Sequence, residues 1–356
     1  MPEKRRRTSR KITVGGLDIG GGSPVSVQSM TNTDTRDAEA TIAQIKRLEA
    51  VGCELVRVAV PDPAAAAELG RIRRAITIPL VADIHFNYRL ALAAVAEGVD
   101  ALRLNPGNIG SAARVREVVA ACRDRRVPIR IGVNGGSLDR ELLDRYGNSP
   151  EALVESALQH VGLLEKENFE LIKISLKSSD VMATLKAYRI LAEKVDYPFH
   201  IGITEAGTRL RGAVKSAVGI ALLLHEGLGD TLRVSLTAAP EDEVFVAYEI
   251  LKSLGFRQRG IELISCPTCG RTEVGLIALA EAVEKALAHI REPLKIAVMG
   301  CVVNGPGEAR HADFGIAGGR GVGLLFRRGE VLRKLPENEL VEALVAEVEN
   351  YLAARQ

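Results

Sequence analysis

Three of the five cysteines in this 356-residue chain lie in its last third, at spacings that suit a metal or cluster site. Cys266 and Cys269 are separated by two residues and followed by a turn-forming glycine. Cys301 follows the apolar run 294–299 and lies in a second glycine-rich turn. Tight turns of this kind aim thiolates at a single ion or cluster. The pattern therefore predicts three thiolate ligands, in preference to buried thiols or a dithiol redox pair.

The spacing leaves the fourth ligand open. Zinc would accept a histidine, such as His289 or His311, whereas a [4Fe–4S] cluster normally uses a fourth cysteine. Cys53 and Cys122 lie elsewhere in the chain and are interpreted as core thiols. Glu308 follows the third cysteine in the same turn and is a candidate, although spacing alone favours an exposed loop acid there.

Eight short β-rich segments alternate with eight helical patterns, which predicts a (β/α)8 TIM barrel of about 250 residues. The predicted strands are 24–30, 54–61, 79–86, 101–106, 128–134, 171–177, 198–204 and 231–237. The predicted helices are 41–51, 63–75, 88–97, 111–124, 150–166, 180–194, 212–225 and 241–254. A doubly wound open sheet is the alternative, and the strand count of eight favours the barrel.

The remaining residues carry a different pattern, which predicts a small α+β domain around the cysteines. Its expected strands and hairpin are 260–265, 294–299, 314–317 and 321–335, and its expected helices are 273–290 and 337–354. The last helix has an apolar stripe that we expect to pack on its own sheet, made of Leu340, Leu344, Val348 and Leu352. We place the domain boundary between a substrate-binding barrel, residues 1–255, and this second domain, residues 256–356.

Polar residues recur at every second position toward the carboxyl ends of the predicted strands. Period two puts each set on one face, which in a barrel is the lumen at the end where active sites lie. These residues are Arg57, Asp83, His85, Asn87, Arg103, Asn105, Arg130, Asn134, Lys173, Ser175, Lys177, Arg233, Ser235 and Thr237. So many buried cations need an anionic ligand. Glycine-rich turns after several strands, with Lys215 in the seventh helix, favour a phosphorylated small molecule.

Bulk composition excludes several other classes of protein. The net charge is +2 and aromatic residues make up 4% of the chain, which disfavours a nucleic-acid or membrane surface. The basic run 4–11 is interpreted as a solvated N-terminal tail. There is no apolar run of about 18 residues and no secretory signal, so five cysteines indicate reduced thiols in the cytoplasm.

Seven motifs distributed along the chain closely resemble the 4-hydroxy-3-methylbut-2-enyl diphosphate synthases. They are CPTCGR (266–271), MGCVVNGPGEA (299–309), VQSMTNT (27–33), ADIHF (82–86), RLNPGN (103–108), GVNGGS (132–137) and GITEAG (202–207). This family comprises iron–sulfur oxidoreductases of the non-mevalonate route of isoprenoid biosynthesis. The chain is similar to the short bacterial form, in which a TIM barrel is followed directly by the iron–sulfur domain.

The resemblance implies a [4Fe–4S] cluster held by Cys266, Cys269, Cys301 and the carboxylate of Glu308. It also implies the substrate 2-C-methyl-D-erythritol 2,4-cyclodiphosphate, whose ring is opened reductively to 4-hydroxy-3-methylbut-2-enyl diphosphate. Two one-electron transfers would pass through the cluster, and the iron without a thiolate would bind a substrate oxygen. The electron donor would be flavodoxin or ferredoxin, and the enzyme would be a homodimer in which the barrel of one chain faces the cluster domain of the other.

The resemblance also assigns residues to substrate binding. Its diphosphate-binding positions are Arg57, Arg103, Arg130, Asn134 and Lys215. The strand argument adds Asp83, Asn87, Asn105, Lys173, Lys177, Arg233 and Ser235. Glu205 and His85 are candidates for proton donation or for positioning, in addition to Glu308 at the cluster.

Two other functions fit parts of the sequence. A pterin-binding barrel, such as dihydropteroate synthase or a corrinoid-dependent methyltransferase, shares the polar strand ends but leaves the cysteine domain unexplained. A zinc-stabilised interaction domain fused to a degenerate barrel would not need a basic lumen. No NAD(P)H or flavin fingerprint occurs between a predicted strand and helix.

Overall fold

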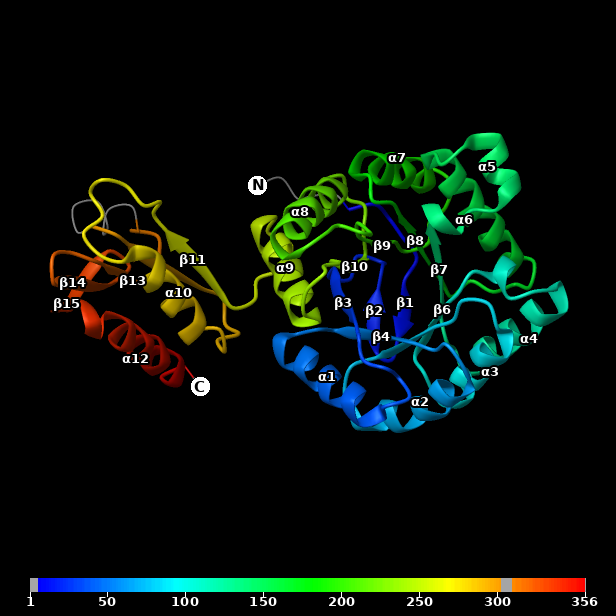
Figure 1. Ribbon diagram of the computed structural model, residues 1–356, viewed down its shortest axis with the longest axis horizontal. Helices are drawn as coiled ribbons and strands as arrows, with labels where there is room; N and C mark the ends of the chain where they lie inside the picture. Colours follow the sequence, from blue (N-terminus) through cyan, green and yellow to red (C-terminus); the bar gives the residue numbers. More distant parts are fainter. Residues whose placement is uncertain (1–5, 302–308, 356) are drawn as a thin grey trace. The chain divides into compact units, whose positions relative to one another are not determined.

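The computed structural model of the protein describes residues 6–301 and 309–355. The chain divides into two compact units, Met1–Arg257 and Gln258–Gln356 (Figure 1). Among the described residues, no helix has the length and apolar character that crossing a membrane requires.

The first unit is a TIM barrel, as predicted. Its strands are all parallel in the order β8-β7-β6-β5-β4-β3-β10-β9, and a bridge between Ile174 and Phe199 joins the two ends of the sheet. The strands are β3 (Ser26–Met30), β4 (Leu55–Ala59), β5 (Leu80–Asp83), β6 (Ala101–Arg103), β7 (Ile129–Asn134), β8 (Ile172–Lys177), β9 (His200–Ile201) and β10 (Thr231–Leu232).

Helices surround the strands and bury their apolar faces against the outside of the barrel (Figure 1). They are α1 (Ala38–Val51), α2 (Pro63–Ala75), α3 (Tyr88–Ala96), α4 (Ala112–Asp124), α6 (Pro150–Glu165), α7 (Val181–Ala192), α8 (Arg209–His225) and α9 (Pro240–Ser253). Side-chain caps explain several starts: Asp62 and Ser149 each accept a hydrogen bond from a backbone amide of the first turn, and proline follows them. An additional helix, α5 (Arg140–Tyr146), precedes α6 and was not predicted.

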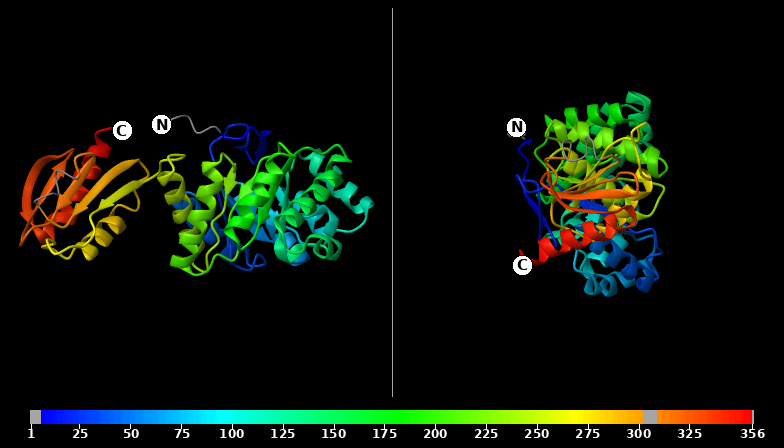
Figure 2. Two further views of the ribbon diagram at one scale, coloured as in Figure 1. Left: turned by 90° about the horizontal axis from the view of Figure 1, so that it is seen from above. Right: turned by 90° about the vertical axis from the view of Figure 1, so that its left-hand side faces the viewer.

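An antiparallel hairpin closes the amino-terminal end of the barrel, and sequence reasoning missed it. Its strands are β1 (Ile12–Val14) and β2 (Leu17–Ile19). Ile12, Val14 and Ile19 pack on side chains at the bottom of the strands, including Leu55 and Val81. The hairpin is the dark-blue element beside the N-terminal end in the left view of Figure 2. Sealing this end leaves the carboxyl ends of the strands as the open end of the barrel.

The basic N-terminal run is not a solvated tail, at least from residue 6 onward. The Arg6 guanidinium donates to Asp230 Oδ1 at 2.8 Å and to backbone oxygens of Ser23 and Gly229. Arg7 donates to the backbone oxygens of Val195 and Tyr197. These residues therefore form an arm bound to the barrel, because loop carbonyls and one buried carboxylate at this end need donors.

The second unit is a five-stranded mixed sheet in the order β11-β12-β13-β14-β15. Its elements are β11 (Ile261–Ser265), α10 (Leu276–Ala286), β12 (Leu294–Met299), β13 (Phe314–Ala317), β14 (Val322–Arg327), β15 (Glu330–Pro336) and α12 (Leu340–Ala353). The predicted stripe of α12 is confirmed, since Leu340, Leu344 and Val348 are buried with residues of α10 and the sheet.

Candidate active site

The barrel interior is built from layers of side chains, and the strand registers show which residues share a layer. The four side chains of a layer come from alternate strands, with an offset set by the strand tilt. Three layers lie toward the open end. The deepest of them contains Arg57, Arg103, Ser175 and Arg233, and the next contains Met30, Asp83, Gly132 and Gly202. The layer nearest the opening contains Ala59, Asn105, Lys177 and Ser235. We call these three layers the mouth.

Asp83 is the carboxylate around which one half of the mouth is organised. It accepts a hydrogen bond from Arg103 Nη1 at 3.2 Å, and its Oδ2 lies 3.8 Å from Arg57 Nε and 3.5 Å from His85 Nε2. Burial acts to raise the pKa of Asp83, but Arg57, the His85 hydrogen bond and Arg103 hold that pKa well below its usual range. The carboxylate therefore remains ionised and fixes the two arginines.

Gly132 allows Arg103 to reach its place. Arg103 Nη2 donates to the Gly132 carbonyl at 2.7 Å. The Asn105 side chain accepts from the Gly132 amide at 2.9 Å and donates to its carbonyl at 3.1 Å. A β-carbon at position 132 would lie 2.4 Å from Arg103 Nε, which no side chain tolerates without displacement. Glycine is thus required beside the guanidinium.

Glu243 organises the other half of the mouth, and sequence reasoning missed it. It comes from the first turn of α9 and is buried. Its carboxylate accepts hydrogen bonds at 3.2 Å from both Nε and Nη2 of Arg233, and one at 3.2 Å from Ser29 Oγ. The Sδ atom of Met30 lies beside the guanidinium groups of Arg57 and Arg233. The sequence did contain a signal for Glu243, because it is an acidic residue in the first turn of the helix that follows the last strand.

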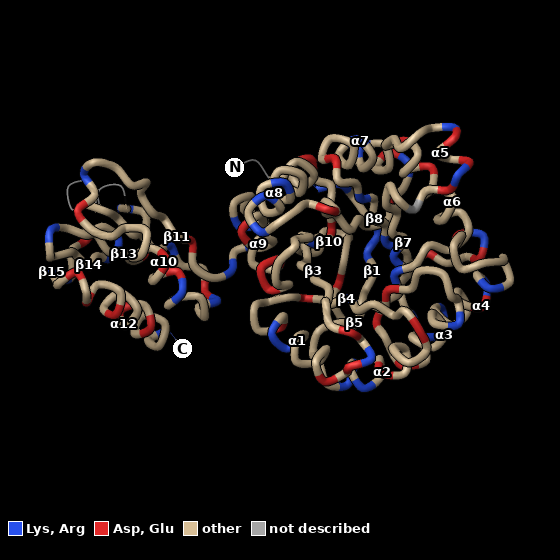
Figure 3. The backbone as a smooth tube through the Cα atoms, in the orientation of Figure 1, with Lys and Arg blue, Asp and Glu red and all other residues tan. Residues whose placement is uncertain are grey.

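The two carboxylates do not balance the cations of the barrel. Within the described part of the chain, no carboxylate lies within ion-pair distance of Arg130 or Lys177. Burial, and then neighbouring cations, lower the pKa of both groups well below their usual values. Burial also lowers the pKa of Arg57 to about 10. Figure 3 shows lysine and arginine positions, in blue, on the strands around the β7 and β8 labels. Such a lumen demands an anionic ligand.

The remaining predicted site residues lie around the mouth or away from it. His85 is largely exposed beside Asp83. Asn87 caps α3, where its side chain accepts from the Arg89 amide at 3.0 Å. Glu205 lies exposed in the loop after β9 with a φ of 52°, a left-handed conformation that is uncommon for a residue with a side chain. The structure therefore brings His85 to the mouth and gives Asn87 a structural contact.

Three further candidate site residues lie at different depths along the barrel axis. Asn134 is half-buried at the end of β7, and Lys215 is half-buried within α8. Lys173, in contrast, lies on β8 four residues before Lys177, so its side chain belongs to a layer beneath the mouth. The strand period correctly predicted that Lys173 faces the lumen, but it gave no depth.

The two cysteine segments meet at the ends of neighbouring parallel strands. β11 and β12 pair in register from Ile261 with Leu294, so both segments leave the sheet at the same edge. The Gly300 amide donates a hydrogen bond to Cys266 Sγ at 3.2 Å. Hydrogen bonds from Arg271 lower the pKa of the Cys269 thiol. These features favour thiolate ligation at this edge.

The ligand set itself is incomplete in what the structure describes. Glu308 lies outside the described residues, which exclude 302–308. Within residues 6–301 and 309–355, no three histidine, cysteine or acidic side chains stand close enough to share a metal ion. The thiols of Cys266, Cys269 and Cys301 are free, and Cys53 and Cys122 are buried core thiols as expected.

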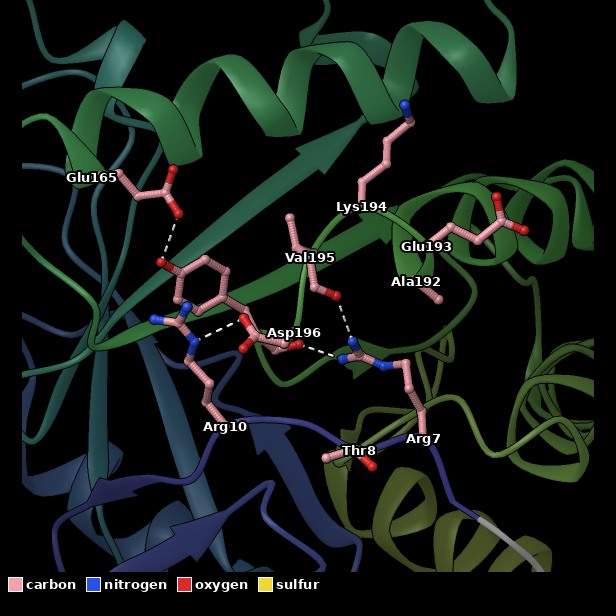
Figure 4. A pocket seen from close by; sticks show the side chains of 10 residues that line it. Arg7, Thr8, Arg10, Glu165, Ala192, Glu193, Lys194, Val195 and Asp196 are labelled. Carbon is pink, nitrogen blue, oxygen red and sulfur yellow. Dashed lines mark hydrogen bonds and ion pairs between the residues drawn. The ribbon is translucent and has the colours of Figure 1, made fainter.

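A surface pocket of about 430 Å³ lies at the amino-terminal end of the barrel, away from the mouth. It is formed by the N-terminal arm and by the segment that leads from α7 into β9 (Figure 4). Arg10 Nε donates to Asp196 Oδ1 at 2.7 Å, and the Tyr197 hydroxyl donates to Glu165 at 2.9 Å. Because these lining groups already have partners, the pocket is a seam between the arm and the barrel.

Comparison with known families matches both units. The family model described as the GcpE TIM-barrel domain matches residues 9–248, and that described as the GcpE protein C-terminal domain matches residues 262–350. The second range includes all three candidate cysteine ligands and Glu308. The two matches follow each other without an inserted domain.

Curated relatives are similar over almost the full chain. A Geobacter sulfurreducens protein named 4-hydroxy-3-methylbut-2-en-1-yl diphosphate synthase (flavodoxin) is 63% identical over 98% of this chain and 99% of its own. A Thermodesulfovibrio yellowstonii protein of the same name is 59% identical over 97% and 99%. Among solved structures, 3-dehydroquinate dehydratase from Geobacillus kaustophilus aligns with a TM-score of 0.51 and 14% identity over 70% of this chain and 99% of its own, which indicates the barrel fold alone.

Proposed function

The chain belongs to the GcpE family of 4-hydroxy-3-methylbut-2-en-1-yl diphosphate synthases, and from this premise we propose that it opens the ring of 2-C-methyl-D-erythritol 2,4-cyclodiphosphate. The cyclic dianion takes up two electrons and one proton. Its bond between carbon and a phosphate oxygen breaks, a hydroxyl group leaves as water, and the diphosphate product carries one additional negative charge. The pterin-binding alternative is not favoured, because both cysteine motifs fall within the second family match.

The observation that carries the proposal is the excess of cations in the barrel. Arg57, Arg103 and Arg233 meet only two carboxylates, Asp83 and Glu243, while Arg130 and Lys177 have no carboxylate partner among the described residues. A diphosphate supplies the missing negative charge, and arginine binds phosphate oxygens through two parallel hydrogen bonds. The ligand class follows from charge, and the specific substrate follows from the family.

The mouth residues have distinct roles in this reaction. Asp83 and Glu243 hold Arg57, Arg103 and Arg233 rigid, so the diphosphate is bound by groups that are already oriented. Because ring opening adds charge to a phosphate oxygen, these cations stabilise the product-like transition state more than the substrate. We assign Asn105, Lys177 and Ser235 to the rim of this site and Asn134 and Lys215 to its edge. Asp83, Asn87 and Arg130 complete the substrate-binding set.

Proton delivery is assigned to the exposed side of the mouth. The His85 imidazole lies beside Asp83, and Glu205 extends from the loop after β9. Either group can deliver a proton to the departing hydroxyl group, since both remain in contact with solvent. The two residues are to be substituted one at a time. The residue whose substitution lowers turnover without weakening binding of the cyclodiphosphate is the proton donor.

We propose a [4Fe–4S] cluster as the redox group, with Cys266, Cys269, Cys301 and Glu308 as its ligands. When bound, the cluster supplies electrons one at a time and a Lewis-acidic iron at the carboxylate corner. The Gly300 hydrogen bond to Cys266 Sγ and the lowered pKa of Cys269 fit thiolates in this role. The electron donor that the relatives' names indicate is flavodoxin, and ferredoxin is the alternative.

The two units of one chain need not form one site. We propose a homodimer in which the barrel of one chain faces the cluster unit of its partner. An apolar stripe on the outer face of α8 supports self-association, since Leu210, Val214 and Val218 recur every four residues and are exposed. The partner in this proposal is a second copy of the chain.

Anaerobic purification tests the redox assignment directly. The protein is expected to be brown, to contain about four irons per chain, and to convert the cyclodiphosphate when an artificial reductant is supplied. One zinc per chain and no visible absorption would contradict the cluster.

Glu308→Ala tests whether Glu308 is the fourth ligand of the cluster. This variant is expected to lose turnover and still bind the cyclodiphosphate, because the substituted residue belongs to the second unit. Full activity of the variant would remove Glu308 from the site while leaving the barrel assignment intact.

A further inference from the structure

A short helical turn follows β6 and holds one of the mouth residues in place. The turn is η1 (Pro106–Asn108), and Asn105 is the residue that precedes it. The Asn108 amide donates a hydrogen bond to the Asn105 carbonyl at 2.9 Å, and Ile109 anchors the far end of the turn in the barrel core. The position of the Asn105 side chain in the mouth therefore depends on how this turn is held.

Asn105 does not cap the turn that it begins. An asparagine before a helical turn ordinarily accepts, through its side chain, a hydrogen bond from the amide of the second or third residue of that turn. The second residue of η1 is Gly107, and the Asn105 side chain makes no capping bond. It accepts instead from the Gly132 amide and donates to the Gly132 carbonyl. The Gly107 amide therefore needs another acceptor.

His160, on α6, supplies that acceptor. The Gly107 amide donates to His160 Nδ1 at 3.2 Å, and His160 is 5% exposed. A β-carbon at position 107 would lie 2.8 Å from His160 Cε1, so glycine is what allows the turn and the ring to approach this closely. Because Nδ1 accepts a hydrogen bond, the neutral ring carries its proton on Nε2.

We propose that His160 is a positioning residue of the diphosphate site, an inference that rests on the proposed function. By accepting from Gly107, the imidazole occupies an amide that would otherwise compete for the Asn105 side chain. Asn105 then stays on Gly132, whose carbonyl also accepts from Arg103. Loss of the acceptor lets Asn105 turn back to cap Gly107. That turn breaks both of its hydrogen bonds with Gly132 and loosens the backbone group that holds the Arg103 guanidinium.

Protonation of His160 has the same consequence as loss of its side chain. An imidazolium carries a proton on both nitrogens, so it cannot accept from the Gly107 amide. Burial lowers the pKa of His160, and Asp139, which precedes α5, acts to raise it. The helix α6 packs on α4, α5, α7, β7, β8 and η1, and among their described neighbours Asp139 is the charged group that acts on this ring. The ring therefore accepts at neutral pH, and the contact is lost as the pH falls through the lowered pKa.

Binding of inorganic pyrophosphate to the full-length protein, measured by titration calorimetry at neutral pH, tests the role of the acceptor. His160→Leu removes it and is expected to weaken the affinity about tenfold, since a hydrogen bond that supports the site is lost. His160→Asn places its Oδ1 where the histidine has Nδ1 and is expected to restore most of the affinity. His225→Leu, at the exposed end of α8, is the matched control and is expected to bind as the native protein does.

The pH dependence separates positioning from a merely structural role. The ratio of the affinity of the native protein to that of His160→Asn cancels the titration of pyrophosphate and of other groups such as His85. This ratio is expected to be constant near neutral pH and to fall as the pH drops through the lowered pKa of His160, because asparagine does not titrate and continues to accept from Gly107. Thermal unfolding at each pH verifies that both proteins are folded.

Equal affinities of the native protein and both His160 variants, with a ratio that does not change with pH, would overturn the role of His160 and leave the diphosphate site intact. Equal losses in His160→Leu and His160→Asn would show that packing of the ring matters and not its acceptor, which also overturns the inference. No binding of pyrophosphate by the native protein would overturn the proposed diphosphate site itself, and the positioning role with it. If His160→Leu does not fold, the pH dependence of the ratio decides, and a constant ratio overturns the inference.

Discussion

At the scale of single residues, the mouth depends on a position that has no side chain. Gly132 lies directly against the Arg103 guanidinium and receives hydrogen bonds from Arg103 and Asn105 through its carbonyl. The same backbone group therefore positions one cation and one amide of the proposed diphosphate site. A side chain there must displace the Arg103 guanidinium, since the β-carbon would lie 2.4 Å from Arg103 Nε. That guanidinium is buried and is already bonded to Asp83 and to the Gly132 carbonyl, so moving it breaks these contacts.

Gly132→Ala is accordingly expected to lower kcat/KM for the cyclodiphosphate by about a hundredfold, since a displacement of about 1 Å at a binding group has that effect. The expected loss of stability is about 1–3 kcal/mol from overpacking. Steady-state kinetics and urea unfolding measure the two effects.

Gly136→Ala is the matched control, because a β-carbon at position 136 meets nothing within 4 Å. It lies in the loop that follows the same strand. Equal losses in both variants would show that the loop, and not the Arg103 contact, is sensitive to substitution.

At the scale of elements, the N-terminal arm and the β1–β2 hairpin close the end of the barrel opposite the mouth. The hairpin covers apolar side chains, and the arm supplies hydrogen-bond donors to partly buried loop carbonyls. The guanidinium of Arg7 also lies 3.8 Å from the centre of the Phe199 ring. The arm thus contributes to the stability of β9 and β10, which are the shortest strands of the barrel.

Arg6→Met is expected to destabilise the protein by roughly 1–3 kcal/mol, because it removes a charge-assisted hydrogen bond to the buried Asp230. Urea unfolding followed by circular dichroism measures the change. Arg10→Met removes a more exposed ion pair with Asp196 and is expected to cost about 1 kcal/mol or less. A larger loss for Arg10→Met than for Arg6→Met would contradict the role of the arm.

At the scale of the whole molecule, the proposed active site joins groups from two compact units. In this proposal, cations in the first unit bind the diphosphate and thiolates in the second unit hold the redox group. Whether the two halves come from one chain or from two is testable without a structure of the complex, because a site shared between subunits can be rebuilt from two inactive variants.

Arg233→Met disables the barrel, and Cys266→Ser disables the cluster unit. Each variant alone is expected to be inactive in turnover of the cyclodiphosphate. When the two are mixed and allowed to exchange subunits, half of the dimers are mixed, and each of these contains one intact site. The expected activity is therefore about a quarter of that of the native protein. No recovery after verified subunit exchange would place both halves of the site in one chain.

Sequence patterns determined much of this protein because they report local physics. Alternating β-rich and helical segments determined the barrel, since each strand and helix follows from its own periodicity. The period-two positions correctly placed Arg57, Arg103 and Arg233 on the lumen face, and the stripe of α12 correctly predicted its packing.

Only the tertiary structure decided depth and partnership. Period two gives the face of a strand but not the height along the barrel axis, which depends on strand tilt and register, so Lys173 could not be separated from Lys177. The partners Glu243 and Asp230 come from segments far along the chain, and the arm that sequence composition assigned to solvent binds one of them. Long-range pairing of charges is set by how strands close into a barrel, and no local pattern contains that information.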